Sequence, residues 1–585
     1  MNSFSTKYRF RENVFVLGVF LAVVHLLYAP AWQSGFVTDF TGLQERLDGA
    51  PFRDFLHCFG FPALHQVTNF FLFLFYKWFG TSPLPWYLVY TSLHVVNGWL
   101  GYQLVKQVLF LSGAVPLPGP LQRESPPRPI FPLWRGPGGR SLEKISIPAF
   151  IAVLLFLVSP YNAETVIWKV CFNFLFCTAM MLSSILLLIK YLKQEKKLSL
   201  IYSYLFFLVA LFTFELALAL PLMVLVIIFW NNSTSTTGQS EKHSKLLTSI
   251  PYFILSGFYF LLNKILLGGW VGHYGESVHL NFDLKNMAAN CLKYFFKNLL
   301  YWRELDHGTK QALISFCENP ITVYTFLTAG ITILFSLLIV HKKLNNRIKS
   351  VFFSWLLFFL ALAPIANLYV AWLLHGENDR YGYFASLFFY AALIISLRLI
   401  NKKMQALIIV SLFGLSIFNL NKINNYWKNS TLVMQGLFND FKWQSNSEIY
   451  ILAFPENYKG IPMFKDFSRQ DLALKSALKY LPKKNTAGKF YQVAQFNMNS
   501  PTDGLSANID SANTIKLEFH EWGSWWWRHG IGTGDYSTEK YEFKTVGKGA
   551  EIKIKNTAKD AAFIYSDGDK WKEVFLNTET RRHRE

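Results

Sequence analysis

Long apolar segments separated by short polar ones fill most of the first 425 residues of this chain. A helix that rises 1.5 Å per residue needs roughly 20 apolar residues to cross the hydrocarbon of a bilayer, and runs of roughly that length recur here. The pattern therefore predicts about eleven membrane-spanning helices. We place them at 14–28, 86–110, 147–158, 170–189, 200–212, 216–230, 250–267, 321–340, 351–363, 384–400 and 406–418.

The pattern changes near residue 430, where hydropathy falls and apolar and polar residues begin to alternate. Segments 449–453, 514–519 and 551–555 have the period of two that is typical of strands, with turn residues between them. The predicted fold class is thus an all-α polytopic membrane protein with a small C-terminal β-rich domain. We expect the transmembrane domain to cover residues 1–425 and the β-rich domain residues 430–585.

Charge decides the sidedness. Lys and Arg gather in the short loops at 112–147, 190–197, 342–349 and 398–403, and all of these fall on one side if the N-terminus is cytoplasmic. The net charge of +20 then reflects topology, so we expect membrane lipids as partners and no nucleic acid. This places the C-terminal domain outside the cytoplasm. A bacterial inner membrane is the expected location.

One further apolar segment, if it spanned the membrane, would no longer leave all the basic loops on the cytoplasmic side. Counting 64–79 as a span would move the basic loop at 112–146 to the outside, and the segment also carries His65 and Lys77. We therefore predict a helix that lies in the outer interface, within a first outer loop at 32–85. The loop at 112–146 is rich in proline, and we interpret it as a cytoplasmic linker.

Three carboxylates fall at the outer ends of predicted helices. Asp39 has apolar neighbours on both sides, which favours a general base, although a solvated loop acid is the alternative. Glu164 follows Pro160 at the tip of a helical hairpin, where it serves either a site or the positive end of the next helix. Glu215 interrupts an apolar run, so we predict a hairpin tip there, with a cation, metal or ligand beside the acid.

Further polar residues lie near these acids in the predicted topology. His94 and Asn97 share a helix face behind the site, where packing is the simpler interpretation of a lone histidine. Later in the chain, the run from Glu377 through Asp379, Arg380 and Tyr381 brings a guanidinium to the level of the lipid headgroups. Arg binds phosphate in a bidentate manner, but paired charges that anchor a helix end would have the same sequence.

Taken in order, these motifs resemble those of the C-class glycosyltransferase superfamily, and in particular its protein O-mannosyltransferase-like branch. The resemblance covers roughly residues 10–400. It is carried by Thr38-Asp39-Phe40, Phe61-Pro62-Ala63-Leu64, Leu93-His94-Val95-Val96-Asn97, the stretch from Ser159-Pro160 to Glu164 and Trp168, Glu215 with Pro221, and Asp379-Arg380-Tyr381.

The resemblance implies an inverting transfer of a sugar from a polyprenyl-phosphate donor to a protein, lipid or glycan acceptor outside the cytoplasm. Asp39 would be the base, and Arg380 with Lys169 would stabilise the departing phosphate. Glu164 and Glu215 would orient the sugar or acceptor, or hold a divalent cation. Because no aspartate-rich metal motif is present, we favour a reaction that requires no cofactor.

The chain also departs from the family pattern. Many members carry two adjacent acids where this chain has Asp39-Phe40, a histidine where it has Ser159, and a lysine where it has Thr213. An inactive scaffold subunit of an envelope or secretion complex is therefore one alternative. A lipid-linked saccharide ligase or a transporter is another, although the acids gather at one face rather than at mid-membrane.

Overall fold

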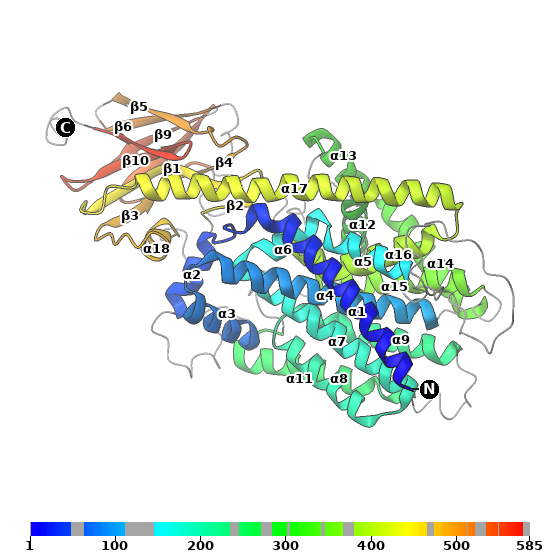
Figure 1. The fold of residues 1–585 in the computed structure, drawn as a ribbon. Coiled ribbons are helices and arrows are strands. Elements are labelled where there is room, and N and C mark those ends of the chain that lie inside the picture. The colour runs from blue at the N-terminus through cyan, green and yellow to red at the C-terminus, as the bar shows by residue number, and fades with distance from the viewer. Residues whose placement is uncertain are drawn as a thin grey trace.

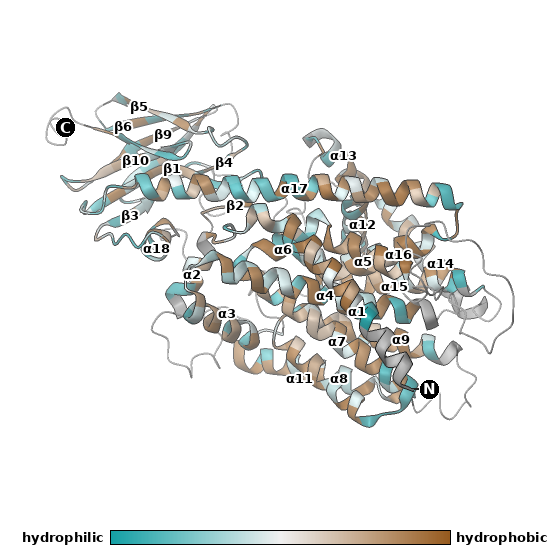
Figure 2. Ribbon diagram, viewed as in Figure 1, coloured by the Kyte–Doolittle hydropathy of each residue, from teal (hydrophilic) through white to brown (hydrophobic). Residues whose placement is uncertain are grey.

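The structure is a computed structural model that describes residues 2–47, 64–111, 146–234, 245–270, 283–300, 305–340, 345–366, 379–464, 473–511, 513–520, 534–547 and 549–576. Most of these residues form helices gathered into one bundle, and one long helix, α17, lies along the bundle (Figure 1). Two sheets stand at the far end of α17. Apolar residues predominate along the bundle helices, as Figure 2 shows.

The helices are α1 (Asn2–Tyr28), α2 (Thr38–Leu47), α3 (Gln66–Phe79), α4 (Pro83–Leu111), α5 (Ile147–Leu157), α6 (Ala163–Ile167), α7 (Phe172–Gln194), α8 (Lys197–Leu211), α9 (Leu220–Thr234), α11 (Ile250–Leu267), α12 (Leu284–Leu300), α13 (His307–Glu318), α14 (Pro320–Val340), α15 (Asn346–Ala366), α16 (Tyr383–Leu397), α17 (Lys402–Asp440) and α18 (Ala473–Tyr480). Short 3-10 turns join several of them, namely η1 (Ala29–Ala31), η3 (Pro160–Asn162), η4 (Lys169–Cys171), η5 (Glu215–Ala219) and η9 (Asp379–Gly382).

All eleven segments predicted as spans are helical where the structure describes them. Six described helices are long and apolar enough to cross a membrane, and the bent pair of α5 with the η3–α6 segment makes a seventh if it counts as one span. They are Arg11–Ala31, Lys169–Gln194, Lys245–Leu267, Arg347–Ala366, Asp379–Leu397 and Lys402–Asp440. A polytopic membrane fold is therefore compatible with the structure, while the number of eleven stays a prediction.

The centre of the bundle consists of α7 and α16, which are apolar around most of their circumference. Nearly every side chain of α16 is buried, and α7 packs against both α4 and α8. A helix that is apolar on all sides must be covered on all sides, so these two helices occupy the interior. Their N-terminal ends carry the turns that bring the polar residues together.

The described part of the segment between α1 and α4 contains the helices α2 and α3. The helix predicted at 64–79 is confirmed as α3, whose N-terminus is tied to the α8–η5 turn because Val67 N–H donates to the Phe212 carbonyl at 3.2 Å. The side chain of Trp78 is 69% exposed at the other end of α3. Its position at a membrane interface remains a prediction. The proline-rich linker lies outside the described residues.

The segment between α11 and α14 lies between two predicted spans, and no helix was predicted there. It contains α12 and α13, and α12 buries the polar residues Asn290, Lys293 and Lys297 against the bundle. These three residues recur at a spacing of three and four, which places them on one helix face. Low overall hydropathy hid this helix because its buried face is polar.

The C-terminal region contains two sheets. The first has the order β11-β10-β1-β2, and β3 and β4 also pair with β1; the second is antiparallel with the order β5-β6-β9-β8-β7. The strands are β1 (Glu448–Tyr458), β2 (Ile461–Pro462), β3 (Lys489–Gln492), β4 (Gln495–Met498), β5 (Leu505–Ser511), β6 (Thr514–Phe519), β7 (Tyr536–Ser537), β8 (Tyr541–Val546), β9 (Gly549–Ile554), β10 (Ala562–Asp567) and β11 (Lys570–Val574). The three predicted strands are confirmed as parts of β1, β6 and β9.

The predicted domain boundary near residue 425 falls inside α17, which runs without a break from Lys402 to Asp440. Its C-terminal half buries Trp427 against Trp168 of the bundle, with ring centroids 6.3 Å apart. Asn424 donates to the carbonyl of Leu27 near the end of α1 at 2.8 Å. One helix thus belongs to both parts of the molecule.

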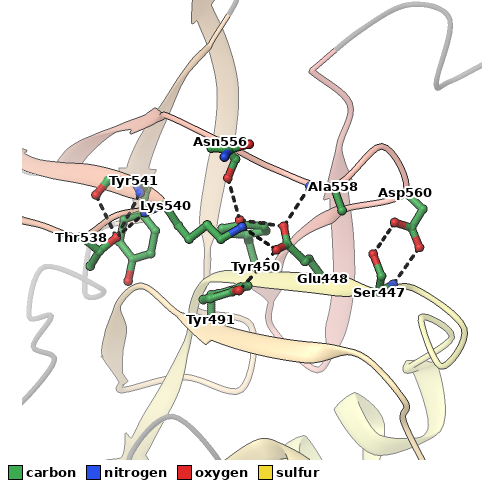
Figure 3. A network of polar contacts seen from close by, with 10 residues as sticks. All are labelled: Ser447, Glu448, Tyr450, Tyr491, Thr538, Lys540, Tyr541, Asn556, Ala558 and Asp560. Carbon is green, nitrogen blue, oxygen red and sulfur yellow. Dashed lines mark hydrogen bonds and ion pairs between the residues drawn. The ribbon is translucent and has the colours of Figure 1, made fainter.

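A polar network lies at the start of β1 (Figure 3). The buried carboxylate of Glu448 accepts hydrogen bonds from Lys540 at 2.7 Å, from the Ala558 N–H at 3.0 Å and from the Tyr450 hydroxyl at 3.0 Å. The Tyr491 hydroxyl adds a fourth at 3.3 Å. Because the groups that Glu448 needs come from β1, β3 and the loops beside β8 and β9, this network joins the two sheets.

Candidate functional site

Glu164 lies on a bent, buried segment between α5 and α7. Pro160 begins the η3 turn after α5 ends at Leu157, since proline cannot continue the hydrogen-bond pattern of the preceding helix. The axis bends by 52° there, and Glu164 falls in the first turn of α6. The break at Pro160 and the place of Glu164 in the first turn of the next helix are as predicted, but Glu164 is only 2% exposed, so it does not lie at a solvated tip.

Arg380 is the partner of Glu164. Nη1 of Arg380 donates to Oε1 of Glu164 at 2.6 Å, and the backbone N–H of Arg380 donates to Oε2 at 2.9 Å. The guanidinium also contacts the rings of Trp168 and Tyr381, with its central carbon 4.8 and 4.9 Å from their centroids. A buried carboxylate is thus matched by a cation and two hydrogen bonds, as its burial requires.

Asp379, the residue before Arg380 in the η9 turn, forms a second buried ion pair with Lys297 of α12. The ammonium of Lys297 lies 5.5 Å from the Tyr161 ring centroid and 5.8 Å from that of Tyr294. Lys297 was missed by the sequence analysis. The signal that could have found it is the polar stripe of Asn290, Lys293 and Lys297 on one face of α12.

Lys169 differs from these cations. It is 1% exposed, and it forms no ion pair with any carboxylate whose side chain the structure describes. The Nζ atom contacts the ring faces of Phe36 and Tyr90, at 5.7 and 5.4 Å from their centroids. The burial of an ammonium without an anion is costly, so Lys169 suits an anionic ligand.

Gly35 holds the segment before α2 against Lys169. Its φ of +93° lies in the left-handed region, and its carbonyl accepts the backbone N–H of Lys169 at 3.1 Å. A Cβ atom at this position would lie 1.9 Å from the carbonyl oxygen of Ile167, so the two backbones touch only because residue 35 has no side chain.

Asp39 lies in the first turn of α2, a few residues after Gly35. Nearby, Phe36 and Phe40 stack edge to face, and both contact Trp86. The backbone at Asp39 is therefore anchored close to the turn that carries Lys169. The side chain of Asp39 and the whole of Glu377 lie outside what the structure describes, so their predicted roles stay predictions.

Glu215 begins the η5 turn between α8 and α9, which confirms the predicted break in that apolar run. Its Oε2 atom accepts a hydrogen bond from Nε2 of His65 at 2.8 Å, and its Oε1 atom accepts one from the Tyr259 hydroxyl at 3.3 Å. His65 precedes α3 and was also missed. A polar partner of Glu215 is therefore a histidine that directly precedes α3.

Phe174 at the start of α7 contacts the sequence neighbours of both Glu215 and Arg380. Its ring centroid lies 4.6 Å from that of Phe214 and 5.4 Å from that of Tyr381. The structure thus brings Glu164, Asp379, Arg380 and Tyr381 into one group, whereas Glu215 bonds with His65 and Tyr259. All of these residues gather around the N-terminal end of α7.

His94 and Asn97 have structural partners. The Tyr383 hydroxyl donates to Nδ1 of His94 at 2.6 Å, and Nε2 of His94 donates to the Leu157 carbonyl at 3.2 Å. Asn97 donates to the Leu175 carbonyl at 2.9 Å and to the Tyr383 hydroxyl at 3.1 Å. These bonds join α4 to α5, α7 and α16. They therefore agree with the interpretation that His94 is a packing residue.

Among the side chains that the structure describes, the group around the bent segment has one more cation than carboxylate. It combines the carboxylates of Glu164 and Asp379 with the cations of Arg380, Lys297 and Lys169, and the two carboxylates are already paired. No group of three metal-binding side chains occurs among the described residues. The arrangement can therefore bind an anion beside Lys169.

No protein-family model and no curated protein matches the chain. The likeness to C-class glycosyltransferases accordingly rests on the motif residues.

Proposed function

We propose that this chain is an integral membrane glycosyltransferase that moves a sugar from a polyprenyl-phosphate donor to an acceptor hydroxyl outside the cytoplasm, with inversion. The observation that supports it most is the ammonium of Lys169, which is buried at the turn next to the Glu164–Arg380 pair and forms no ion pair with a described carboxylate. A phosphate group of the donor would supply the anion that the ammonium of Lys169 lacks. The expected setting is a bacterial inner membrane, with the N-terminus in the cytoplasm.

In this proposal, Asp39 takes the proton of the acceptor hydroxyl. The acceptor oxygen attacks the anomeric carbon, the bond from that carbon to the phosphate oxygen breaks, and the phosphate leaves with the bonding electrons. Lys169 stabilises the charge that develops on the phosphate. The guanidinium of Arg380, held by Glu164 and stacked between Trp168 and Tyr381, lines the same region.

The test is the transfer of radiolabelled sugar from a native membrane lipid extract by purified protein. Asp39→Asn keeps the shape of the side chain but removes the base, and Asp510→Asn, at an exposed position on β5, is the matched control. We expect transfer by the wild type and by the control but not by Asp39→Asn. Equal transfer by all three would refute the role of Asp39.

A catalytically inactive scaffold is the second candidate. It is favoured by the mutual pairing of Asp379 with Lys297 and of Arg380 with Glu164, since these contacts also serve as structural anchors. Binding of lipid-phosphate sugar without transfer by the wild type would support this candidate over the enzyme.

A further inference from the structure

The helix α18 is held at the end of the bundle where the first apolar segment ends. That segment, Arg11–Ala31, is long and apolar enough to cross a membrane, and α2 begins soon after it at Thr38. The helix α18 packs against α2, where the Ser476 hydroxyl donates to Oε2 of Glu45 at 2.7 Å. Figure 1 shows α18 beside α2, at the same end of the bundle as α3. In a bilayer that α1 spans, α18 therefore lies close to the membrane surface.

The chain is basic along α18 and the strands that follow it. It has no aspartate or glutamate from Leu472 to Thr502, but it has five lysines there. Lys484 has a structural role, because its ammonium donates to three carbonyls at the end of α17, and the last carbonyls of a helix lack partners within the helix. The other four, which we call the α18 lysines, are Lys475, Lys479, Lys483 and Lys489.

The α18 lysines lie close together. Lys475 and Lys479 are one turn apart and share a helix face, while the leucines of the same helix are buried. The ammonium of Lys475 donates to the Gly488 carbonyl at 3.1 Å, which brings α18 next to Lys489. The side chains of Lys479, Lys483 and Lys489 are exposed. This segment thus presents a group of cations and contributes no carboxylate of its own to balance them.

We propose that the α18 lysines bind the headgroups of anionic phospholipids in the bilayer around the bundle. Each lysine near a charged membrane surface raises membrane affinity roughly fivefold. This attraction extends over about one Debye length, roughly 10 Å at 0.1 M salt, so side chains just above the surface are within its range. The aliphatic stem of lysine also lets the ammonium reach a phosphate oxygen without movement of the backbone.

Lipid is the occupant that the fold itself brings to these lysines. Headgroups are present at the level of α2 wherever the apolar helices are embedded, whereas an acidic protein or glycan would have to be supplied separately. Lipid binding at α18 does not require the proposed transfer reaction, because the α18 lysines take no part in it and lie outside the group around Lys169 and Arg380. The two proposals are therefore tested separately.

Acetylation of lysines in the full-length protein, measured residue by residue with mass spectrometry, tests the lipid contact. The protein is placed in nanodiscs of phosphatidylcholine alone or of phosphatidylcholine mixed with phosphatidylglycerol. We expect acetylation of Lys479, Lys483 and Lys489 to slow roughly fivefold in the mixed discs, and high salt to remove the difference. Lys544 and Lys553, exposed on β8 and β9 of the second sheet, are internal controls and should react equally fast in both discs.

A pair of double variants tests whether the lysines act together. Lys479→Gln with Lys483→Gln should restore fast acetylation of Lys489 in the mixed discs, because fewer cations then hold the segment at the surface. Lys544→Gln with Lys553→Gln is the matched control and should leave Lys489 protected. If Lys489 stayed protected in both double variants, its protection would not come from the α18 lysines and the proposal would be wrong.

Three further outcomes would overturn the lipid contact. The first is equal acetylation of the α18 lysines in the two kinds of disc. The second is an equal slowing at Lys544 and Lys553, which would be a general effect of the charged disc. The third is protection in native membrane vesicles but not in the mixed discs, which would assign the surface to an acidic protein or glycan instead of lipid.

Discussion

The carboxylate of Glu164 accepts two hydrogen bonds from Arg380. One oxygen accepts from the guanidinium and the other from the backbone N–H of the same residue. This contact joins segments 216 positions apart in the chain. It fixes the η9 turn against the bent segment between α5 and α7, so the position of Asp379 and its ion pair with Lys297 depend on it as well.

Glu164→Gln should destabilise the protein strongly. The substitution leaves the guanidinium of Arg380 buried without its counter-charge, a change that typically costs about 3–5 kcal/mol. Denaturant unfolding in detergent, followed by tryptophan fluorescence, measures the free energy of unfolding. Glu195→Gln is the control, since that carboxylate is 66% exposed in its pair with Lys245 and should cost less than about 1 kcal/mol. Similar losses in the two variants would contradict the importance of the buried pair.

Lys169→Met should leave the fold intact and weaken donor binding. No carboxylate of the described residues loses a partner when the ammonium is removed, so stability should stay equal or rise. A charge-assisted hydrogen bond to phosphate is worth roughly 1.5–3 kcal/mol, which corresponds to roughly a 10- to 100-fold loss of affinity for a polyprenyl phosphate. Lys190→Met, at an exposed position near the other end of α7, is the control for a binding assay. Unaltered affinity in Lys169→Met would remove Lys169 from the phosphate site.

Gly35→Ala should separate the segment before α2 from the turn at Lys169. The added Cβ would overlap the Ile167 carbonyl oxygen, and the positive φ of residue 35 disfavours any side chain. We expect a loss of more than about 1 kcal/mol in denaturant unfolding. Gly18→Ala in α1 has no atom within 4 Å of the new Cβ and should be neutral or slightly stabilising. The close approach at Gly35 would be in doubt if both variants unfolded alike.

Lowering the pH should destabilise the C-terminal sheets, because Glu448 becomes protonated. Burial raises the pKa of this carboxyl, but the hydrogen bonds from Lys540, the Ala558 N–H and the Tyr450 hydroxyl outweigh burial, so its pKa lies below the ordinary 4.5. A lowered pKa means that the stabilisation is present above 4.5 and is lost as the pH falls through the folded value. Unfolding measured from pH 7 to pH 3 should show this loss in the wild type.

Glu448→Gln should be less stable than the wild type at pH 7 and should lose less stability on acidification. Glu518→Gln serves as the control, because that carboxylate is 58% exposed and 3.5 Å from Lys516. Lys540 titrates at alkaline pH. The hydrogen bond to Glu448 raises the pKa of Lys540, so the stabilisation that Lys540 contributes is present below pH 10.5 and is lost at higher pH. If wild type and Glu448→Gln lost the same stability between pH 7 and pH 3, Glu448 would not be the cause of the loss.

Local pattern determined a large part of this fold. Apolar runs are helical wherever they are described, Pro160 ends α5, the charge of Glu215 marks the turn after α8, and alternating residues form β1, β6 and β9. Each of these features depends on a few neighbouring residues, since a helix needs a continuous run, a strand needs a period of two, and a proline or a charge interrupts either.

Only the tertiary structure decided which polar groups meet. Arg380 pairs with Glu164, Asp379 with Lys297 and Glu215 with His65. The sequence gave no reason to choose Lys297 or His65 as the partner of a buried acid. The 39-residue length of α17 and the contact between α2 and α18 likewise depend on packing between distant segments. The physical reason is that periodicity states which side of an element is apolar, whereas the neighbour across that side is set by how all the helices pack at once.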